Sequence, residues 1–244
     1  MRTDLLDATA SVNWARTNFP AFQSRINTWL SDNIKIAFRD GDASSPDDFA
    51  VMIKREPLPL SFNVEFGAYI NAIRSSLDIL ANTLANRHGI MGKDVCFPVA
   101  KSLSDFNIGK YNGSKFINKL PASERKIIES LKPYSGGNDL LWELHRMDIT
   151  RKHHRLLIAR VEMSGMTFEP GIPHGTTEHR RDRLPPETDT ETVLFSIKKG
   201  ITKPRIKFIP KVFTAEPALG LATPATIMLE RFADMTLYII GKFR

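Results

Sequence analysis

The sequence predicts an α+β fold that is mostly helical, with two long packed helices, additional helices and a small antiparallel sheet. Two observations lead to this prediction. Apolar residues recur at helical spacing over residues 61–88 and 139–159. Short runs rich in β-branched and aromatic residues, bounded by turn-forming residues, occur within residues 34–53 and 192–213.

The size and composition of the chain fit a single domain. It has 244 residues, of which 42% are hydrophobic, so it can bury a full core. We expect one domain over residues 1–244, with a helical core at 61–160, a polar loop at 163–186, and C-terminal strands and a helix at 192–242. Two small domains are the alternative.

The single cysteine and the N-terminal residues predict a cytoplasmic protein. Cys96 has no partner for a disulfide within the chain, and a cysteine-rich zinc site is excluded. The first residues include Asp4 and Asp7 and no long apolar run, unlike a signal peptide. Apolar stretches fall short of the roughly 18 residues that a membrane span requires, so we expect no membrane association.

The first third of the chain predicts helices and a hairpin. Apolar residues between 4 and 30 recur near helical spacing, and Pro20 is expected to interrupt them, which predicts one or two helices. Residues 34–38 and 49–53 predict the two strands of a β-hairpin.

The middle of the chain predicts further helices. The long pattern over residues 61–88 predicts a helix that ends before Gly89. Residues 97–118 predict a connection with one short helix, and residues 121–131 predict another helix.

The C-terminal part predicts a loop, two strands and a helix. Residues 163–186 are polar and rich in proline, which predicts a long loop. Residues 192–197 and 205–213 predict strands that pair with each other around a Lys-Gly turn, and residues 223–242 predict a final helix. Two histidines in the loop are expected to be plain solvent-exposed residues: His174 and His179.

A carboxylate falls on the apolar face of the second long helix. We expect Asp139 to cap this helix, which should end near residue 159. At about 100° per residue, Asp148 falls within the arc that contains Leu141 and Ile158. Burying an unpaired carboxylate costs several kcal/mol, so Asp148 should have a cationic partner or open onto a cleft.

Two sides of this helix carry polar residues. His145, Asp148 and Lys152 lie along one side at spacings i, i+3 and i+7. Arg146 and His153 lie along another side at i and i+7.

The first long helix has a similar polar border. Arg74 and Asp78 lie at i and i+4 beside its apolar stripe, so we expect the two helices to face each other. Natural ion pairs between them would be Arg74 with Asp148, and Asp78 with Lys152 or Arg151.

Three interpretations of these residues remain open. They can form a salt-bridge lattice that fixes how the helices pack. They can form a general acid–base site, because histidine ionises near neutral pH. They can also form a metal site, in which His145 and Asp148 would act with His153 or His154.

Four sequence blocks resemble an uncharacterised bacterial family. They read AIRSSLDIL, FP, PY and LWELHRMDITRKH, and they begin at residues 72, 97, 133 and 141. The family has the blocks LRSALDHL, FPI, QPY and LW.LHELD.IDKHR in the same order. The resemblance covers about residues 62–157 and implies no established activity.

The last block departs from the family at two positions. Arg151 stands where the family has aspartate, and His154 stands where it has arginine. A site that needed either side chain would be altered. The other polar residues match the family: Arg74, Asp78, Asp148, Lys152 and His153.

Arg146 and His153 also resemble the R-x(4 to 6)-H motif of HEPN ribonucleases, which cleave RNA without a metal and usually act as dimers. The resemblance implies that His153 would move a proton at the 2′-hydroxyl or the leaving oxygen. Arg146 would hold the charged phosphate. Both side chains would then have to be exposed in one cleft.

A basic segment near the C-terminus is a candidate nucleic-acid-binding surface. The net charge of the chain is +7, which favours polyanions. Six cations lie within and before the last predicted strand, where they could follow a phosphate backbone or simply protect a solvated sheet face. They are Lys198, Lys199, Lys203, Arg205, Lys207 and Lys211.

The sequence therefore predicts a nucleic-acid-directed protein, with a HEPN-like, metal-independent ribonuclease of toxin or phage-defence type as its specific form. The catalytic residues would be Arg146 and His153. The supporting residues would be Arg74, Asp78, His145, Asp148 and Lys152. RNA and a second copy of the chain are the expected partners.

Two other functions stay open. One is a non-catalytic interaction or sensor protein in which the polar residues are structural, and the weaker one is a metal-dependent hydrolase. The sequence contains no dinucleotide-binding, nucleophile-elbow or zincin motif, and we expect no cofactor.

Overall fold

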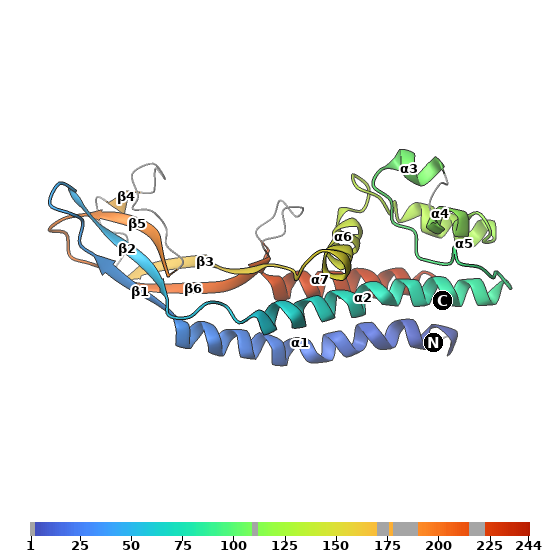
Figure 1. The fold of residues 1–244 in the computed structure, drawn as a ribbon, viewed down its shortest axis with the longest axis horizontal. Helices are drawn as coiled ribbons and strands as arrows, with labels where there is room; N and C mark the ends of the chain where they lie inside the picture. Colours follow the sequence, from blue (N-terminus) through green and yellow to red (C-terminus); the bar gives the residue numbers. More distant parts are fainter. Residues whose placement is uncertain (1–2, 109–111, 170–175, 178–189, 215–222) are drawn as a thin grey trace. The chain divides into compact units, whose positions relative to one another are not determined.

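The computed structural model describes residues 3–108, 112–169, 176–177, 190–214 and 223–244. Its fold is α+β and mostly helical, as predicted, with two small sheets (Figure 1). Contacts within the chain define two compact units, which we describe separately. The helical unit comprises Met1–Phe22, Leu60–Ala159 and Thr214–Arg244, and the sheet unit comprises Gln23–Pro59 and Arg160–Phe213.

The predicted division of the chain differs from these units. Of the predicted C-terminal strands and helix at 192–242, the strands belong to the sheet unit and the helix belongs to the helical unit. The single domain over residues 1–244 stays a prediction.

Helix α1 (Leu6–Asn33) follows a short 3-10 turn and continues through Pro20, where we predicted an interruption. Proline removes one amide donor, so the backbone loses one helical hydrogen bond there. The adjacent Phe19 and Phe22 are 5% and 1% exposed. Burial of these rings offsets the missing bond, and the expected interruption was wrong.

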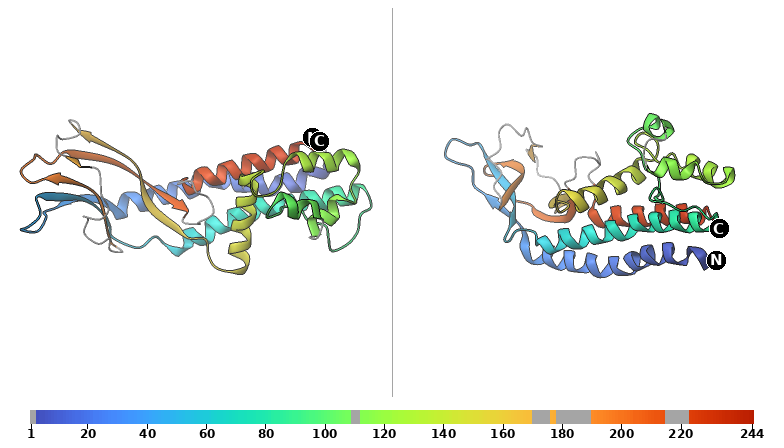
Figure 2. Two further views of the ribbon diagram at one scale, coloured as in Figure 1. Left: turned by 90° about the horizontal axis from the view of Figure 1, so that it is seen from above. Right: turned by 45° about the vertical axis from the view of Figure 1, so that its right-hand side comes forward.

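Helix α2 (Leu60–Arg87) is the central element of the helical unit and confirms the predicted long helix. It contacts both α6 and α7 and runs alongside α7 in two views (Figures 1 and 2). Gly89 has a φ of +61°, and the amide of Ile90 donates to the carbonyl of Ala85 at 2.9 Å. This left-handed ending confirms the predicted stop, because glycine adopts a positive φ without strain.

Two short helices occupy the connection where one was predicted. They are α3 (Leu103–Ile108) and α4 (Asn112–Ile117). The hydroxyl of Ser102 accepts from the amide of Asp105 at 3.1 Å and caps α3. Helices α5 (Ala122–Ser130) and α7 (Ala225–Gly241) confirm the two other predicted helices.

Helix α6 (Asp139–His153) is shorter than predicted and has a different cap. Asn138 caps it, because its side-chain oxygen accepts from the amide of Leu141 at 3.0 Å. At the C-terminal end the predicted apolar arc was wrong for Ile158, which is exposed. The chain instead enters a strand at Ala159.

The first of the two sheets has its strands in the order β1-β2-β5-β4 and lies in the sheet unit. Its strands are β1 (Ile34–Arg39), β2 (Asp47–Lys54), β5 (Glu191–Lys198) and β4 (Thr176–Thr177). The antiparallel pairing of β1 with β2 confirms the predicted hairpin, with Ile34 opposite Lys54.

The second sheet pairs β3 (Ala159–Glu169) with β6 (Arg205–Thr214). The predicted pairing of β5 with β6 is therefore wrong, since β5 pairs with β2. The predicted loop 163–186 is also wrong for residues 163–169, which belong to β3. Two histidines of that loop lie outside the described residues: His174 and His179.

Within the described ranges, each helix is too short or too polar to pass through a lipid bilayer.

Candidate functional site

The two long helices face each other, as predicted, but through different contacts. Helix α2 packs against α6. Nε of Arg74 donates to Nδ1 of His145 at 3.2 Å, and Nη2 of Arg151 donates to the side chain of Asn71 at 2.6 Å. These two hydrogen bonds link the helices.

The predicted ion pairs between the helices are wrong. Arg74 pairs instead with Asp78 of the same helix at 2.9 Å. Asp148 is 4% exposed and pairs within α6, with Lys152 at 2.5 Å and Arg151 at 3.7 Å. Residues three or four positions apart are neighbours on one helix, so these pairs need no reach across the interface. Asp148 has the cationic partners that its burial required.

Arg74 and Asp78 together hold the backbone of Phe97. Oδ1 of Asp78 accepts from the Phe97 amide at 3.0 Å, and Nη2 of Arg74 donates to the Phe97 carbonyl at 3.3 Å. Three residues later, the amide of Ala100 donates to the carbonyl of Pro133 at 2.9 Å. The segment from Phe97 to Ala100 is therefore held at both ends.

His145 is held as a neutral imidazole. Burial and the neighbouring Arg74 charge lower the pKa of His145 to about 4, although Asp78 acts in the opposite direction. The ring is therefore uncharged at neutral pH. Because Nδ1 accepts from Arg74, the ring proton belongs on Nε2, which is then a hydrogen-bond donor.

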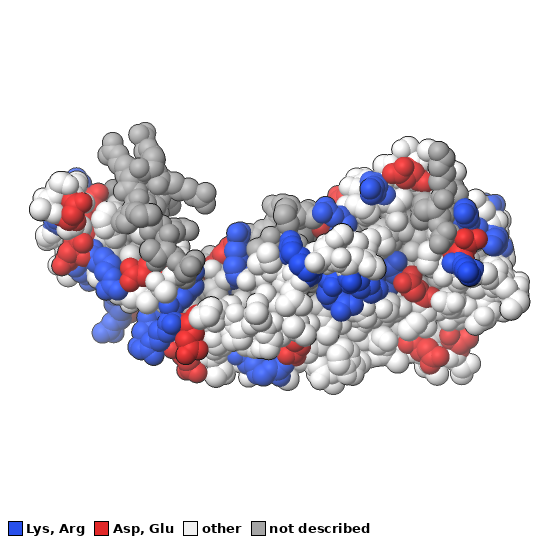
Figure 3. All heavy atoms as spheres, viewed as in Figure 1, with Lys and Arg blue, Asp and Glu red and all other residues white. Residues whose placement is uncertain are grey.

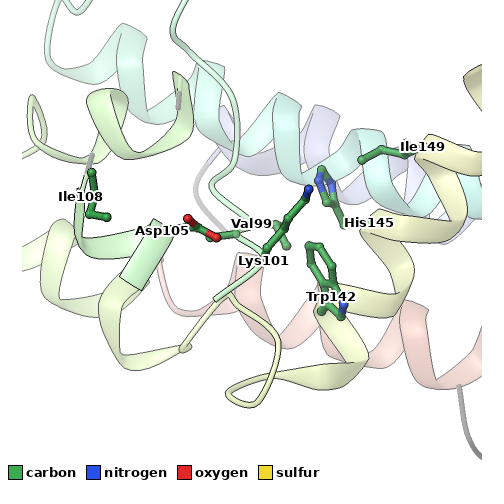
Figure 4. A pocket seen from close by; sticks show the side chains of 8 residues that line it. Val99, Lys101, Asp105, Ile108, Trp142, His145 and Ile149 are labelled. Carbon is green, nitrogen blue, oxygen red and sulfur yellow. The ribbon is translucent and has the colours of Figure 1, made fainter. Parts of the chain in front are cut away.

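A pocket of about 450 Å³ lies beside His145 (Figure 4). We call it the His145 pocket. It is lined by Val99, Ala100, Lys101, Asp105, Ile108, Trp142, His145 and Ile149. Three of these residues come from one side of α6 at spacings i, i+3 and i+7, and the others come from α3 and the segment that precedes it.

The pocket combines apolar walls with a few polar groups. The rings of Trp142 and His145 lie beside each other, with centroids 6.1 Å apart. The Lys101 side chain extends toward His145 in Figure 4, and its ammonium has no ion pair among the described residues. Asp105 lines the pocket as well, and its Oδ2 accepts from the hydroxyl of Ser102 at 2.9 Å.

The predicted catalytic pair lies outside the residues that line this pocket. Arg146 and His153 are both exposed on α6. They lie on the same side of the helix and about 10 Å apart along its axis. Arg146 is about 40° around the helix from Trp142, as His153 is from Ile149. The pair therefore borders the pocket side of α6.

Acidic neighbours surround part of the predicted nucleic-acid surface in the sheet unit. Lys203 pairs with Asp40 at 3.0 Å and with Asp48 at 3.3 Å, and Lys207 pairs with Glu169 at 2.5 Å. Figure 3 shows red and blue spheres close together over this unit. The remaining cations of the group have no carboxylate pair among the described residues: Lys198, Lys199, Arg205 and Lys211.

No cluster of three or more histidine, cysteine, aspartate or glutamate side chains in the described part of the chain could hold a metal ion. The predicted ligands are dispersed. His145 accepts a hydrogen bond from Arg74, Asp148 is paired with cations, and His153 and His154 are exposed. The metal-site interpretation thus gains no support.

Sequence reasoning missed most of the pocket. Lys101, Asp105 and Trp142 were not candidates, although the spacing of Trp142, His145 and Ile149 places all three on one side of α6. That spacing is the sequence signal that could have identified Trp142 as a neighbour of His145. The contribution of Val99 and Lys101 depends on where the chain returns after α2, which no local pattern shows.

No family model, curated protein or solved structure matches this chain.

Proposed function

We propose that the helical unit binds a small ligand in the His145 pocket, and that the protein acts as a sensor or interaction protein. The observation that supports this proposal is the pocket itself. Its volume of about 450 Å³ falls in the range of small-molecule sites, and mostly apolar walls with a few converging polar groups are typical of them.

In this proposal the charged residues behind the pocket have a structural role. Arg74 is 4% exposed and contacts His145, Asp78 and Phe97 at once. These contacts fix the imidazole and one wall of the pocket before any ligand arrives. Binding to a preformed site avoids the entropy cost of ordering it.

A substitution in the pocket wall tests ligand binding. Ile149 is 37% exposed and lines the pocket, so Ile149→Arg places a charge and extra volume there. We expect planar ring compounds to raise the melting temperature of the wild type and not that of Ile149→Arg. A ligand at 100 times its Kd stabilises a protein by about 2.7 kcal/mol, which a thermal-shift assay detects.

Ile158→Arg is the matched control, because Ile158 is 44% exposed and does not line the pocket. It should respond to ligand as the wild type does. Equal responses of Ile149→Arg and the wild type would place binding elsewhere and reject the proposal.

A metal-independent ribonuclease of toxin or phage-defence type is the second candidate. The observation in its favour is that Arg146 and His153 are both exposed on one side of α6, beside the pocket. In this function His153 transfers a proton at the 2′-hydroxyl or leaving oxygen, and Arg146 stabilises the phosphate charge. Their separation along the helix favours a site completed by a second copy of the chain.

An RNA cleavage assay in EDTA tests this candidate. We expect the wild type to cleave a mixed RNA pool, and Arg146→Ala or His153→Ala to lose about a hundredfold or more of the rate. His154→Ala is the control, since His154 is exposed beside the helix end and has no role in the motif. Intact RNA with the wild type, or equal loss in His154→Ala, would exclude the assigned pair.

A further inference from the structure

We infer that the His145 pocket holds a nucleobase, which stacks on Trp142 and accepts a hydrogen bond from His145, while its phosphate group lies at Lys101. This inference rests on the proposed ligand binding. The base can belong to a free nucleotide or to single-stranded RNA, and the experiment below separates the two sources.

The walls of the pocket suit a flat ring. Trp142 offers an indole face, and Val99 and Ile149 offer aliphatic surface from two different elements. Every nucleobase has a π-face, so any of the bases can stack on an aromatic side chain. A pocket of about 450 Å³ leaves room for a base with its attached sugar.

The hydrogen-bonding groups suit the edge of a base. Nε2 of His145 is a donor of fixed position, because Arg74 holds the opposite nitrogen at 3.2 Å. A ring nitrogen or carbonyl of a base accepts such a bond. Oδ1 of Asp105 has no partner among the residues described, since Ser102 bonds Oδ2, and it can accept from an exocyclic amino group.

The charges suit a ligand with an anionic end. Lys101 is exposed, lines the pocket and carries an ammonium without a carboxylate partner in the described part of the chain. Asp105 has the opposite charge to Lys101. A ring compound that is only anionic should therefore bind less tightly than one that also presents an N–H donor to the Asp105 carboxylate. Adenine, cytosine and guanine nucleotides present both, whereas uracil lacks the amino group.

The side of α6 next to the pocket suits a nucleic-acid chain. Arg146 is exposed about 40° around the helix from Trp142. A phosphate that follows the bound base can reach this guanidinium, whereas the phosphate of a mononucleotide is held at Lys101. The two sources therefore differ in their dependence on Arg146.

Isothermal titration calorimetry of the full chain tests the inference. The probes are AMP, UMP, adenosine, an adenine-rich single-stranded RNA of eight nucleotides, and indole-3-carboxylate as an aromatic anion. The variants are Trp142→Leu, Trp142→Phe, Lys101→Met, Asp105→Asn and Arg146→Ala. Lys126→Met is the control, because Lys126 is exposed and outside the pocket. Circular dichroism checks that each variant folds.

We expect AMP to bind the wild type more tightly than UMP, and Asp105→Asn to reduce that preference. Trp142→Leu should weaken AMP about tenfold or more, whereas Trp142→Phe, which keeps an aromatic face, should retain binding. Lys101→Met should weaken AMP but not adenosine. RNA that binds more tightly than AMP and loses this gain in Arg146→Ala identifies RNA as the source, and equal binding identifies the free nucleotide.

Three results overturn the inference and are distinguishable from one another. Binding of indole-3-carboxylate without any nucleotide or RNA rejects the base and leaves the proposed function standing. Absence of binding by every probe, together with equal thermal shifts of the wild type and Ile149→Arg, rejects both. Nucleotide binding that survives Trp142→Leu and Lys101→Met unchanged also overturns it, because the site must then lie elsewhere.

Discussion

Single residues of α2 and α6 have roles that their spacing only partly indicates. The i+4 relation of Arg74 and Asp78 predicted a charged border, and burial at Asp148 predicted a cationic partner. The hydrogen bonds from this border to the Phe97 backbone join residues that are 19 and 23 positions apart in the sequence. At the residue scale, the sequence therefore predicted which charged side chains need a partner, but only part of the groups that they contact.

The neutral state of His145 predicts a specific pH dependence of stability. Folding lowers the pKa of His145 from 6.5 to about 4, so the unfolded chain binds this proton more tightly. This effect is absent above about pH 6.5, and it lowers the stability of the folded protein increasingly as the pH falls toward 4. Its size is on the order of 3 kcal/mol, from about 1.4 kcal/mol per pKa unit.

His145→Gln isolates this contribution, because glutamine can accept the Arg74 hydrogen bond without titrating. Urea unfolding between pH 4 and 7.5 should show that the stability difference between wild type and variant changes across this range. A difference that is constant with pH would mean that the imidazole keeps its ordinary pKa in the folded protein.

Whole elements were predicted well where a pattern was long and local. Helix α2 and the hairpin of β1 and β2 follow the expected residues closely. Helix α6 ends before the expected residues, and of the apolar residues that follow it Leu157 is buried whereas Leu156 and Ile158 are exposed. Local periodicity does not distinguish a buried face from exposed apolar residues in a connecting segment.

The cap of α6 gives a prediction at this scale. Asn138 accepts from the amide of Leu141, whereas Asp139 lies inside the helix and accepts from the amide of Gly136 at 2.7 Å. We expect Asn138→Ala to lower the free energy of unfolding by about 1 kcal/mol in urea denaturation. A smaller effect from Asn138→Ala than from Asp139→Ala would return the cap to Asp139.

At the scale of the whole molecule, local sequence patterns could not predict which distant strands pair. Strands β5 and β6 are close in sequence, so a hairpin was expected, yet each pairs with a strand from elsewhere in the chain. Strand β5 pairs with β2, and Ser196 lies opposite Phe49. Apolar alternation shows that a segment is a strand, and it does not name the partner.

An engineered disulfide tests this pairing. In a Cys96→Ser background, Phe49→Cys with Ser196→Cys should oxidise to an intramolecular disulfide, because directly opposed residues have the short Cα separation that the bond needs. Ser196→Cys with Lys207→Cys should remain reduced, since β5 and β6 belong to different sheets. Mass spectrometry of the unreduced chains reads both results. The reverse outcome would restore the predicted hairpin.

The sequence by itself determined the mostly helical α+β class, the long helices and the hairpin, because these follow from local periodicity and turn chemistry. The tertiary structure decided which polar groups meet. It brought Trp142, His145 and Lys101 around one pocket, left Arg146 and His153 exposed beside it, and paired β5 with β2. Contacts between residues far apart in the chain depend on how whole elements pack, and no local spacing encodes that arrangement.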